Sequence, residues 1–159
     1  MIKDRIKILR NKFNNLGIDG YIVPKNDEFF SEYAENDRLK NISNFTGSAG
    51  LAIILKKNNY LFVDGRYTIQ GQNESGKNFK IIEIHKKLPH MIIKNCRLGF
   101  DPLLFTSNKL KHYFSNNITL IPIDENLIDK IYKNKTKKTD PFFSLSKNIT
   151  GESHQTKIK

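Results

Sequence analysis

Two apolar runs separated by four polar residues constrain the fold of this chain more than any other feature. The runs LAIIL (51–55) and YLFVD (60–64) flank KKNN (56–59), which predicts an antiparallel β-hairpin with a four-residue loop. Nearly every residue of both runs is apolar, whereas a strand with one face in water alternates apolar and polar side chains. We therefore expect this hairpin to lie in a sheet that helices cover on both faces.

The rest of the chain alternates between helical and strand patterns. Apolar residues recur at helical spacing from Ile2 to Leu16, and Gly17 is expected to end this first helix. Further strands are predicted at 18–24, 79–86, 97–102 and 118–124, and further helices at 38–45, 66–75, 106–116 and 125–134, with a short helix or turn at 88–95. This order predicts an α/β fold, a six-stranded mixed β-sheet flanked by helices on both faces.

The length of 159 residues suits one domain, and the character of the sequence changes after residue 134. We expect a domain at 1–134, followed by a mobile linker at 135–159 that ends in the first turn of a truncated second domain. No apolar run approaches the roughly 20 residues that span a bilayer, and the amino-terminal residues lack the apolar core of a signal peptide. These features predict a cytoplasmic protein.

The net charge of +11 raises the question of a nucleic-acid partner. The lysines are spread along the chain, and no zinc-finger spacing, RNP-like aromatic motif or arginine-rich block accompanies them. This argues against nucleic acid, although a small basic protein that binds nucleic acid or acidic partners stays open as an alternative. The single cysteine, Cys96, has apolar neighbours and is expected to be a buried structural thiol.

The turn formed by residues 47–50 (GSAG) raises the question of a serine nucleophile. A nucleophilic serine usually follows a strand and precedes a helix, whereas Ser48 leads into a strand and has no histidine nearby in sequence. The segment also lacks the lysine and the preceding strand of phosphate-binding glycine loops. We interpret the glycines as allowing a tight turn with positive φ and close backbone approach.

Metal binding has little support in the sequence. No two histidines have the spacing of a helical zinc site, and the five acidic residues between 27 and 37 do not match a calcium loop, so we expect a solvated acidic segment. The histidines are His85, His90, His112 and His154, and the acidic residues are Asp27, Glu28, Glu32, Glu35 and Asp37. The sequence predicts neither a catalytic nor a metal-ligating residue.

Arg66 is a stronger candidate, because it follows a predicted strand through Asp64 and Gly65, where side chains point off the edge of a sheet. Its planar fork suits a carboxylate or a peptide carbonyl. The alternative is a local salt bridge between Arg66 and Asp64, which residue chemistry alone favours.

Three motifs in order, DEFFSEY (27–33), NFTGSAG (44–50) and VDGRY (63–67), resemble the N-terminal domain of Xaa-Pro aminopeptidases of the creatinase/prolidase superfamily. The similarity extends to ENLIDKIYKN (125–134) and the tail ITGESHQTKI (149–158). The resemblance implies a six-stranded α/β domain without catalytic residues. It assigns to Arg66 a role in binding peptide substrate.

In that family a separate catalytic domain holds two divalent metal ions, usually manganese, and cleaves the peptide bond before proline. The resemblance therefore implies a chain that is inactive alone, has no cofactor of its own and acts on peptide with a catalytic domain supplied in trans. It leaves a homodimer open. Two further hypotheses are that the chain is one product of a split gene and that it is a non-functional gene remnant.

Overall fold

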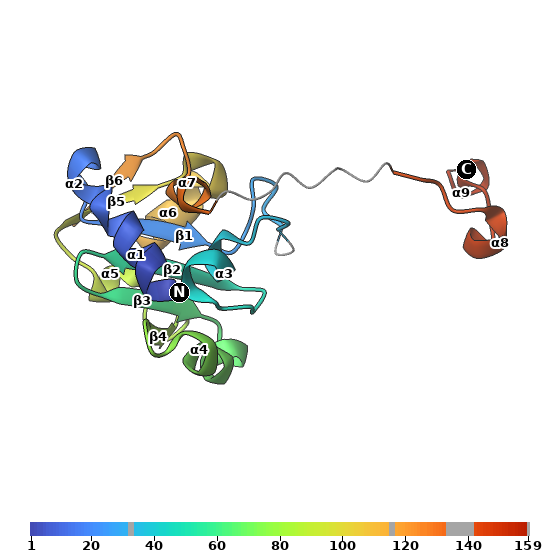
Figure 1. Ribbon diagram of the computed structural model, residues 1–159. Coiled ribbons are helices and arrows are strands. Elements are labelled where there is room, and N and C mark those ends of the chain that lie inside the picture. The colour runs from blue at the N-terminus through green and yellow to red at the C-terminus, as the bar shows by residue number, and fades with distance from the viewer. Residues whose placement is uncertain (32–33, 115–116, 133–141, 159) are drawn as a thin grey trace.

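A six-stranded sheet forms the centre of the computed structural model, which describes residues 1–31, 34–114, 117–132 and 142–158 (Figure 1). The strand order is β4-β3-β2-β1-β5-β6, and β2 is antiparallel to both of its neighbours while the other adjacent pairs are parallel. The predicted six-stranded mixed sheet is confirmed. Its strands are β1 (Gly20–Pro24), β2 (Gly50–Leu55), β3 (Asn59–Val63), β4 (Lys80–Glu83), β5 (Cys96–Phe100) and β6 (Ile118–Pro122).

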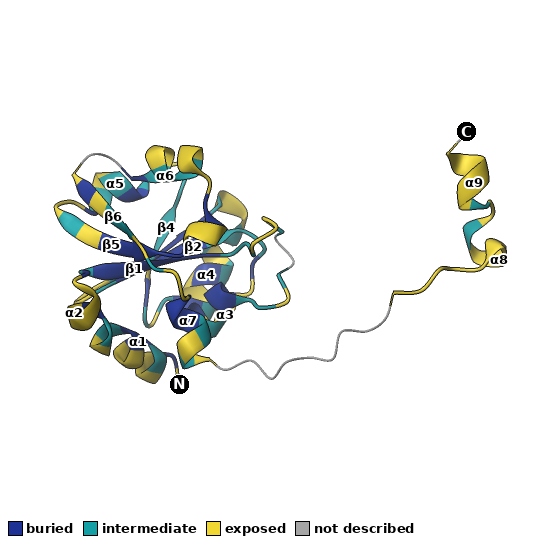
Figure 2. Cartoon of the chain, turned by 90° about the horizontal axis from the view of Figure 1, so that it is seen from above, coloured by how far each residue is buried: buried dark blue, intermediate teal, exposed yellow. Residues whose placement is uncertain are grey.

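Helices cover both faces of this sheet, as predicted (Figure 2). One apolar cluster joins one face to α1, α2, α3 and α7, and a second joins the other face to α5 and α6. The helices are α1 (Ile2–Asn11), α2 (Phe13–Leu16), α3 (Arg38–Ser43), α4 (Thr68–Ser75), α5 (Pro89–Ile92), α6 (Ser107–Tyr113) and α7 (Leu127–Ile131), with 3-10 turns η1 (Gly65–Tyr67) and η2 (Pro102–Leu104).

The predicted hairpin is confirmed, with a shorter loop than expected. Asn59 pairs with Ile54 and so belongs to β3, and the Leu55 amide donates to the Asn58 carbonyl at 2.8 Å. Alternate side chains of β2 point to opposite faces of the sheet: Ala52 and Ile54 lie in the first apolar cluster, and Ile53 lies in the second. Burial on both faces explains why the run contains no polar residue.

The first helix ends where the sequence predicts and contains one interruption. Gly17 has φ of 60°, the left-handed conformation that glycine adopts without a steric penalty. At Lys12 the amide donates to the Leu9 carbonyl three residues back, so a tighter turn divides α1 from α2. The predicted single helix is therefore two consecutive helices.

The topology brings the ends of five strands to one edge of the sheet. Strands β1, β3, β4, β5 and β6 run in one direction, so their carboxyl ends share this edge, and the antiparallel β2 begins there at Gly50. We call it the carboxyl edge. Open α/β sheets bind ligands at this edge, beyond the ends of the parallel strands.

The tail contains two short helices, α8 (Lys147–Thr150) and α9 (His154–Lys157). Ser153 caps α9 by accepting a hydrogen bond from the Thr156 amide at 3.2 Å, so the predicted helix start is present, whereas α8 was not predicted. The predicted domain boundary at 134/135 and the first part of the predicted mobile linker lie outside the described residues.

Candidate functional site

Arg66 lies in η1, directly after β3 reaches the carboxyl edge. Its side chain is 71% exposed and forms a salt bridge with Asp64, Nη2 to Oδ2, at 2.6 Å. The Arg66 amide also donates to Asp64 Oδ1 at 2.8 Å, and the guanidinium lies 5.2 Å from the centre of the Tyr67 ring. These hydrogen bonds hold the pKa of Asp64 below its usual value. The local salt bridge is present, and it holds a largely exposed guanidinium in a defined position.

Tyr67 connects Ser48 to this arginine, because it contacts both side chains. The Ser48 hydroxyl and the Tyr67 hydroxyl are 2.9 Å apart, so the two groups share a hydrogen bond. Among the described residues the hydrogen-bond partner of the Ser48 side chain is this phenol, and no histidine or carboxylate is paired with it. The arrangement agrees with Ser48 as part of the turn and not as a nucleophile.

The positive φ expected in the turn at residues 47–50 is not present there. Gly47 and Gly50 lie outside the left-handed region, and Asn44, which ends α3, has φ of 67°. The expected close approach is confirmed, because a Cβ on Gly47 would lie 2.3 Å from Phe45 Cζ, and one on Gly50 would lie 2.9 Å from Leu39 Cδ2. The two glycines are needed for space, not for backbone conformation.

The acidic segment is paired and not simply solvated, which corrects that expectation for the residues described. The Glu28 carboxylate accepts from Arg38 Nη2 at 2.9 Å, and the buried Arg38 guanidinium also binds Asp129 of α7. Asp37 caps α3 and forms a salt bridge with Lys25 at 2.5 Å. Through these contacts Glu28 and Asp37 are attached to α3, and Arg38 extends the link to α7. Glu32 lies outside the described residues.

A family model for the creatinase/prolidase N-terminal domain matches residues 5–131. The chain belongs to this family. Among its relatives are Xaa-Pro aminopeptidase 2 of Rattus norvegicus, 30% identical over 97% of this chain and 25% of the relative, and Xaa-Pro aminopeptidase 1 of Dictyostelium discoideum, 30% identical over 99% and 29%. The chain therefore spans between a quarter and a third of the length of these relatives.

Solved structures share the fold. The X-prolyl aminopeptidase of Caenorhabditis elegans matches with a TM-score of 0.73 and 22% identity, over 99% of this chain and 30% of that one. The N-terminal, creatinase/prolidase-like domain of a putative metallopeptidase from Corynebacterium diphtheriae matches with a TM-score of 0.62 and 20% identity, over 77% of this chain and 95% of that one. The second match is with a domain of similar extent.

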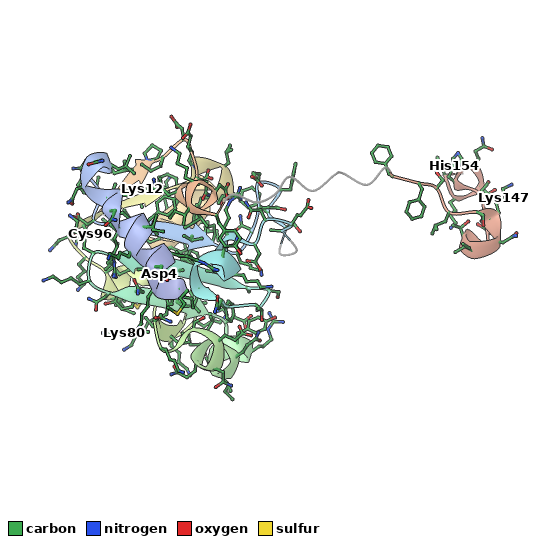
Figure 3. All side chains as sticks on the ribbon, in the orientation of Figure 1. Asp4, Lys12, Lys80, Cys96, Lys147 and His154 are labelled. Carbon is green, nitrogen blue, oxygen red and sulfur yellow. The ribbon has the colours of Figure 1, made fainter. Side chains whose placement is uncertain are left out.

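The four histidines of the chain lie in different parts of its sequence. His85 follows β4, His90 lies in α5 and His112 in α6. His154 lies in α9 of the tail (Figure 3). Within the described ranges no group of three histidine, cysteine or acidic side chains could hold a metal ion. The same residues contain no helix that is both long and apolar enough to cross a membrane.

Lysines occur both in the domain and in the tail that follows it. Figure 3 labels Lys12 between α1 and α2, Lys80 in β4 and Lys147 in α8, three separate parts of the chain. Cys96, at the start of β5, is half-buried, and burial raises the pKa of its thiol to about 11. The thiol is less buried than predicted, yet it stays protonated at neutral pH as a structural cysteine does.

The sequence patterns did not identify two polar residues at the carboxyl edge. Asn26 follows β1, and Lys109 lies in the first turn of α6; Lys109 Nζ lies 3.4 Å from Asn26 Oδ1. They are 83 positions apart in sequence. In the sequence, Lys109 is one of many lysines, and no local pattern separates it from the exposed ones.

Proposed function

We propose that this domain is the non-catalytic N-terminal part of an Xaa-Pro aminopeptidase-like metallopeptidase, and that it helps to bind peptides whose N-terminal residue before proline is removed. The relatives that match nearly the whole chain carry that name, and the chain covers about a quarter of the rat protein. The proposal gives the chain a binding role and leaves hydrolysis to a second domain.

The geometry of Arg66 is the observation that carries this proposal. Asp64 fixes the guanidinium by accepting hydrogen bonds from Nε and Nη2, while the side chain stays largely exposed at the carboxyl edge. A fixed guanidinium loses little conformational freedom when it donates to a peptide carbonyl or carboxylate. An arginine so placed suits a role as an accessory contact for substrate.

We assign the metal chemistry to the catalytic domain. The family resemblance implies two divalent ions there, usually manganese, and the similar C. elegans enzyme is described as cytosolic with a di-nuclear active site. The described residues of this chain do not fit such a pair of ions, because they bring no three ligand side chains together. No step of hydrolysis is therefore assigned to this chain, and a cytoplasmic location is part of the proposal.

The test compares the chain alone with the chain supplied with a catalytic domain. The purified chain should release no amino acid from a peptide with proline at its second position, with or without Mn²⁺. The catalytic part of the Dictyostelium relative, added in trans or fused after residue 159, should gain activity from the chain. Gel filtration with light scattering would show in the same samples whether the chain forms the homodimer that we also propose.

Arg66→Ala in this assembly should lower kcat/KM about tenfold or more, since hydrogen bonds to charged groups contribute about 1.5–3 kcal/mol. Arg66→Lys should recover only part of the loss, because lysine keeps the charge and loses the planar fork. Lys56→Ala is the control: Lys56 is also an exposed, paired cation, but it lies in the hairpin loop at the opposite edge. Hydrolysis by the chain alone, or equal effects of Arg66→Ala and Lys56→Ala, would refute the proposal.

A further inference from the structure

A cavity of about 250 Å³ opens at the carboxyl edge, between the strand ends and α6. Pro24, Lys25 and Asn26 line it after β1, and Phe62, Val63 and Asp64 line it at the end of β3. The turn at residues 48–51 and the α6 residues Lys109 and Tyr113 also line it. No residue of this cavity carried a proposed role apart from the Asp64 partner of Arg66.

Its two lysines differ in how their charges are balanced. Lys25 forms a salt bridge with Asp37, so its charge is neutralised. Lys109 has only the Asn26 amide oxygen, at 3.4 Å, and no salt bridge to any carboxylate in the part of the chain that the structure describes. An ammonium group can donate three hydrogen bonds, so Lys109 is a half-buried cation with unused donors.

Two other hydrogen bonds hold the Asn26 side chain in place beside Lys109. Asn26 Nδ2 donates to the Leu104 carbonyl and to the Asp27 carbonyl, both at 3.0 Å, which fixes the amide oxygen toward Lys109. Burial lowers the pKa of Lys109, the expected result when a cation loses water without gaining a counter-charge. An anion in the cavity would supply that missing charge.

Asp64 is the negative group on the same wall, and its oxygens are already engaged. Its carboxylate accepts hydrogen bonds from the backbone and side chain of Arg66, at 2.6–3.1 Å. No salt bridge joins it to Lys109 among the described residues. The cavity therefore offers an incoming anion one cation that Asp64 does not neutralise.

The other walls favour an apolar group beside the anion. Leu51, Phe62 and Ile84 line the cavity with aliphatic and aromatic carbon, and Phe30 joins them from the segment after β1. Phe30 has φ of 60°, which is uncommon for a bulky side chain. The volume lies below the roughly 300–1,000 Å³ of pockets that enclose a whole drug-sized ligand, so one end of a peptide fits better than a complete one.

We propose that this cavity binds the carboxylate end of a short peptide with an apolar last residue, with Lys109 as the cation that the carboxylate meets. The carboxylate accepts from Lys109, and the last side chain packs on Leu51, Phe62 and Ile84. This goes beyond the proposed function and does not depend on it, because the isolated chain should bind such a peptide without hydrolysing it.

The test is an amide NMR titration of the full chain with three probes at low salt: acetyl-Ala-Phe with a free carboxylate, the same peptide as its C-terminal amide, and sodium phosphate. The free-carboxylate peptide should shift the amides of Ser48, Lys109 and Tyr113. The amide should bind at least tenfold more weakly, since it lacks only the charge. Phosphate should leave the amides beside Leu51 and Ile84 unchanged, because it has no apolar part.

Lys109→Met keeps the aliphatic stem and removes the charge, and it should weaken the free-carboxylate peptide at least tenfold while the chain stays folded. Lys111→Met, an exposed lysine on the same helix, is the matched control and should leave binding unchanged. Equal binding of the amidated peptide, equal effects of the two variants, or phosphate shifts of the amides beside Leu51 and Ile84 as large as those caused by the peptide would overturn the proposal. The comparison of peptide with amide uses the unaltered chain, so it decides the matter even if Lys109→Met does not fold.

Discussion

Gly47→Ala tests the conclusion that the turn at the carboxyl edge needs space and not a special backbone conformation. The added Cβ would lie 2.3 Å from Phe45 Cζ and 2.9 Å from Phe45 Cε1, well inside contact distance. The Phe45 ring is fully buried and packs edge-on against the Tyr67 ring at 5.8 Å, so it cannot move aside without disturbing its neighbours. Such overpacking costs about 1–3 kcal/mol of unfolding free energy.

Urea unfolding should show this as a lower midpoint with an unchanged slope, and a thermal scan as a fall in Tm of roughly 3–10 °C for a chain of this size. Gly65→Ala is the control, because its Cβ would meet Glu83 Oε1 at 3.4 Å, an ordinary contact. This control should change the unfolding free energy by less than about 0.5 kcal/mol.

Two further variants separate space from conformation. Phe45→Leu removes the ring that the new Cβ strikes, so Gly47→Ala should cost less in that background than in the wild type, a positive coupling in the double-mutant cycle. Gly47→Asn should be at least as damaging as Gly47→Ala, although asparagine tolerates positive φ better. Strict additivity, a harmless Gly47→Ala, or rescue by asparagine would refute the close-approach argument.

Three other predictions concern charge and reactivity. Hydrogen bonds from Lys56 and from the backbone of β5 lower the pKa of Asp19 from its usual value, so its stabilisation is present above the unfolded-state pKa and is lost as the pH falls through the folded pKa; Asp19→Asn should lower Tm at pH 7, and this loss should shrink as the pH falls through that window. Burial raises the pKa of the Cys96 thiol to about 11. Alkylation of this thiol by iodoacetamide at pH 8 should therefore be at least about tenfold slower in the folded chain than in urea. Arg38→Met should cost about 1.5–3 kcal/mol in urea unfolding, because it removes charged hydrogen bonds to the part-exposed Asp129; a change below about 0.5 kcal/mol would contradict this.

The elements of the fold were predictable because they depend on local patterns. The largely apolar runs of β2 and β3 identified a hairpin buried on both faces, and Gly17 identified the end of α2. The pairings that organise the carboxyl edge depend on distant residues and left no local signal. Arg38 binds Asp129 across 91 positions, and the sequence alone made the acidic segment look solvated.

The candidate site shows the same division. The family resemblance selected Arg66, and the local salt bridge to Asp64 that residue chemistry favoured is present, while the role of Arg66 in binding substrate stays a prediction. Lys109 was not selected, because its half-buried position beside Asn26 exists only after β1 and α6 come together. A sequence pattern locates a residue on an element, but its charge balance is decided by the neighbours that folding supplies.

The two family motifs on either side of the hairpin form one packed unit. The Phe45 ring lies beneath Gly47 and against Tyr67, the Tyr67 hydroxyl bonds to Ser48, and the Arg66 guanidinium lies over the Tyr67 ring. The turn therefore supports Tyr67, and Tyr67 supports Arg66. If Arg66 contacts substrate, then Gly47→Ala should lower kcat/KM in the reconstituted enzyme even where the domain remains folded, and adding Phe45→Leu should restore part of it. A stability loss without any effect on kcat/KM would mean that the turn serves the fold alone.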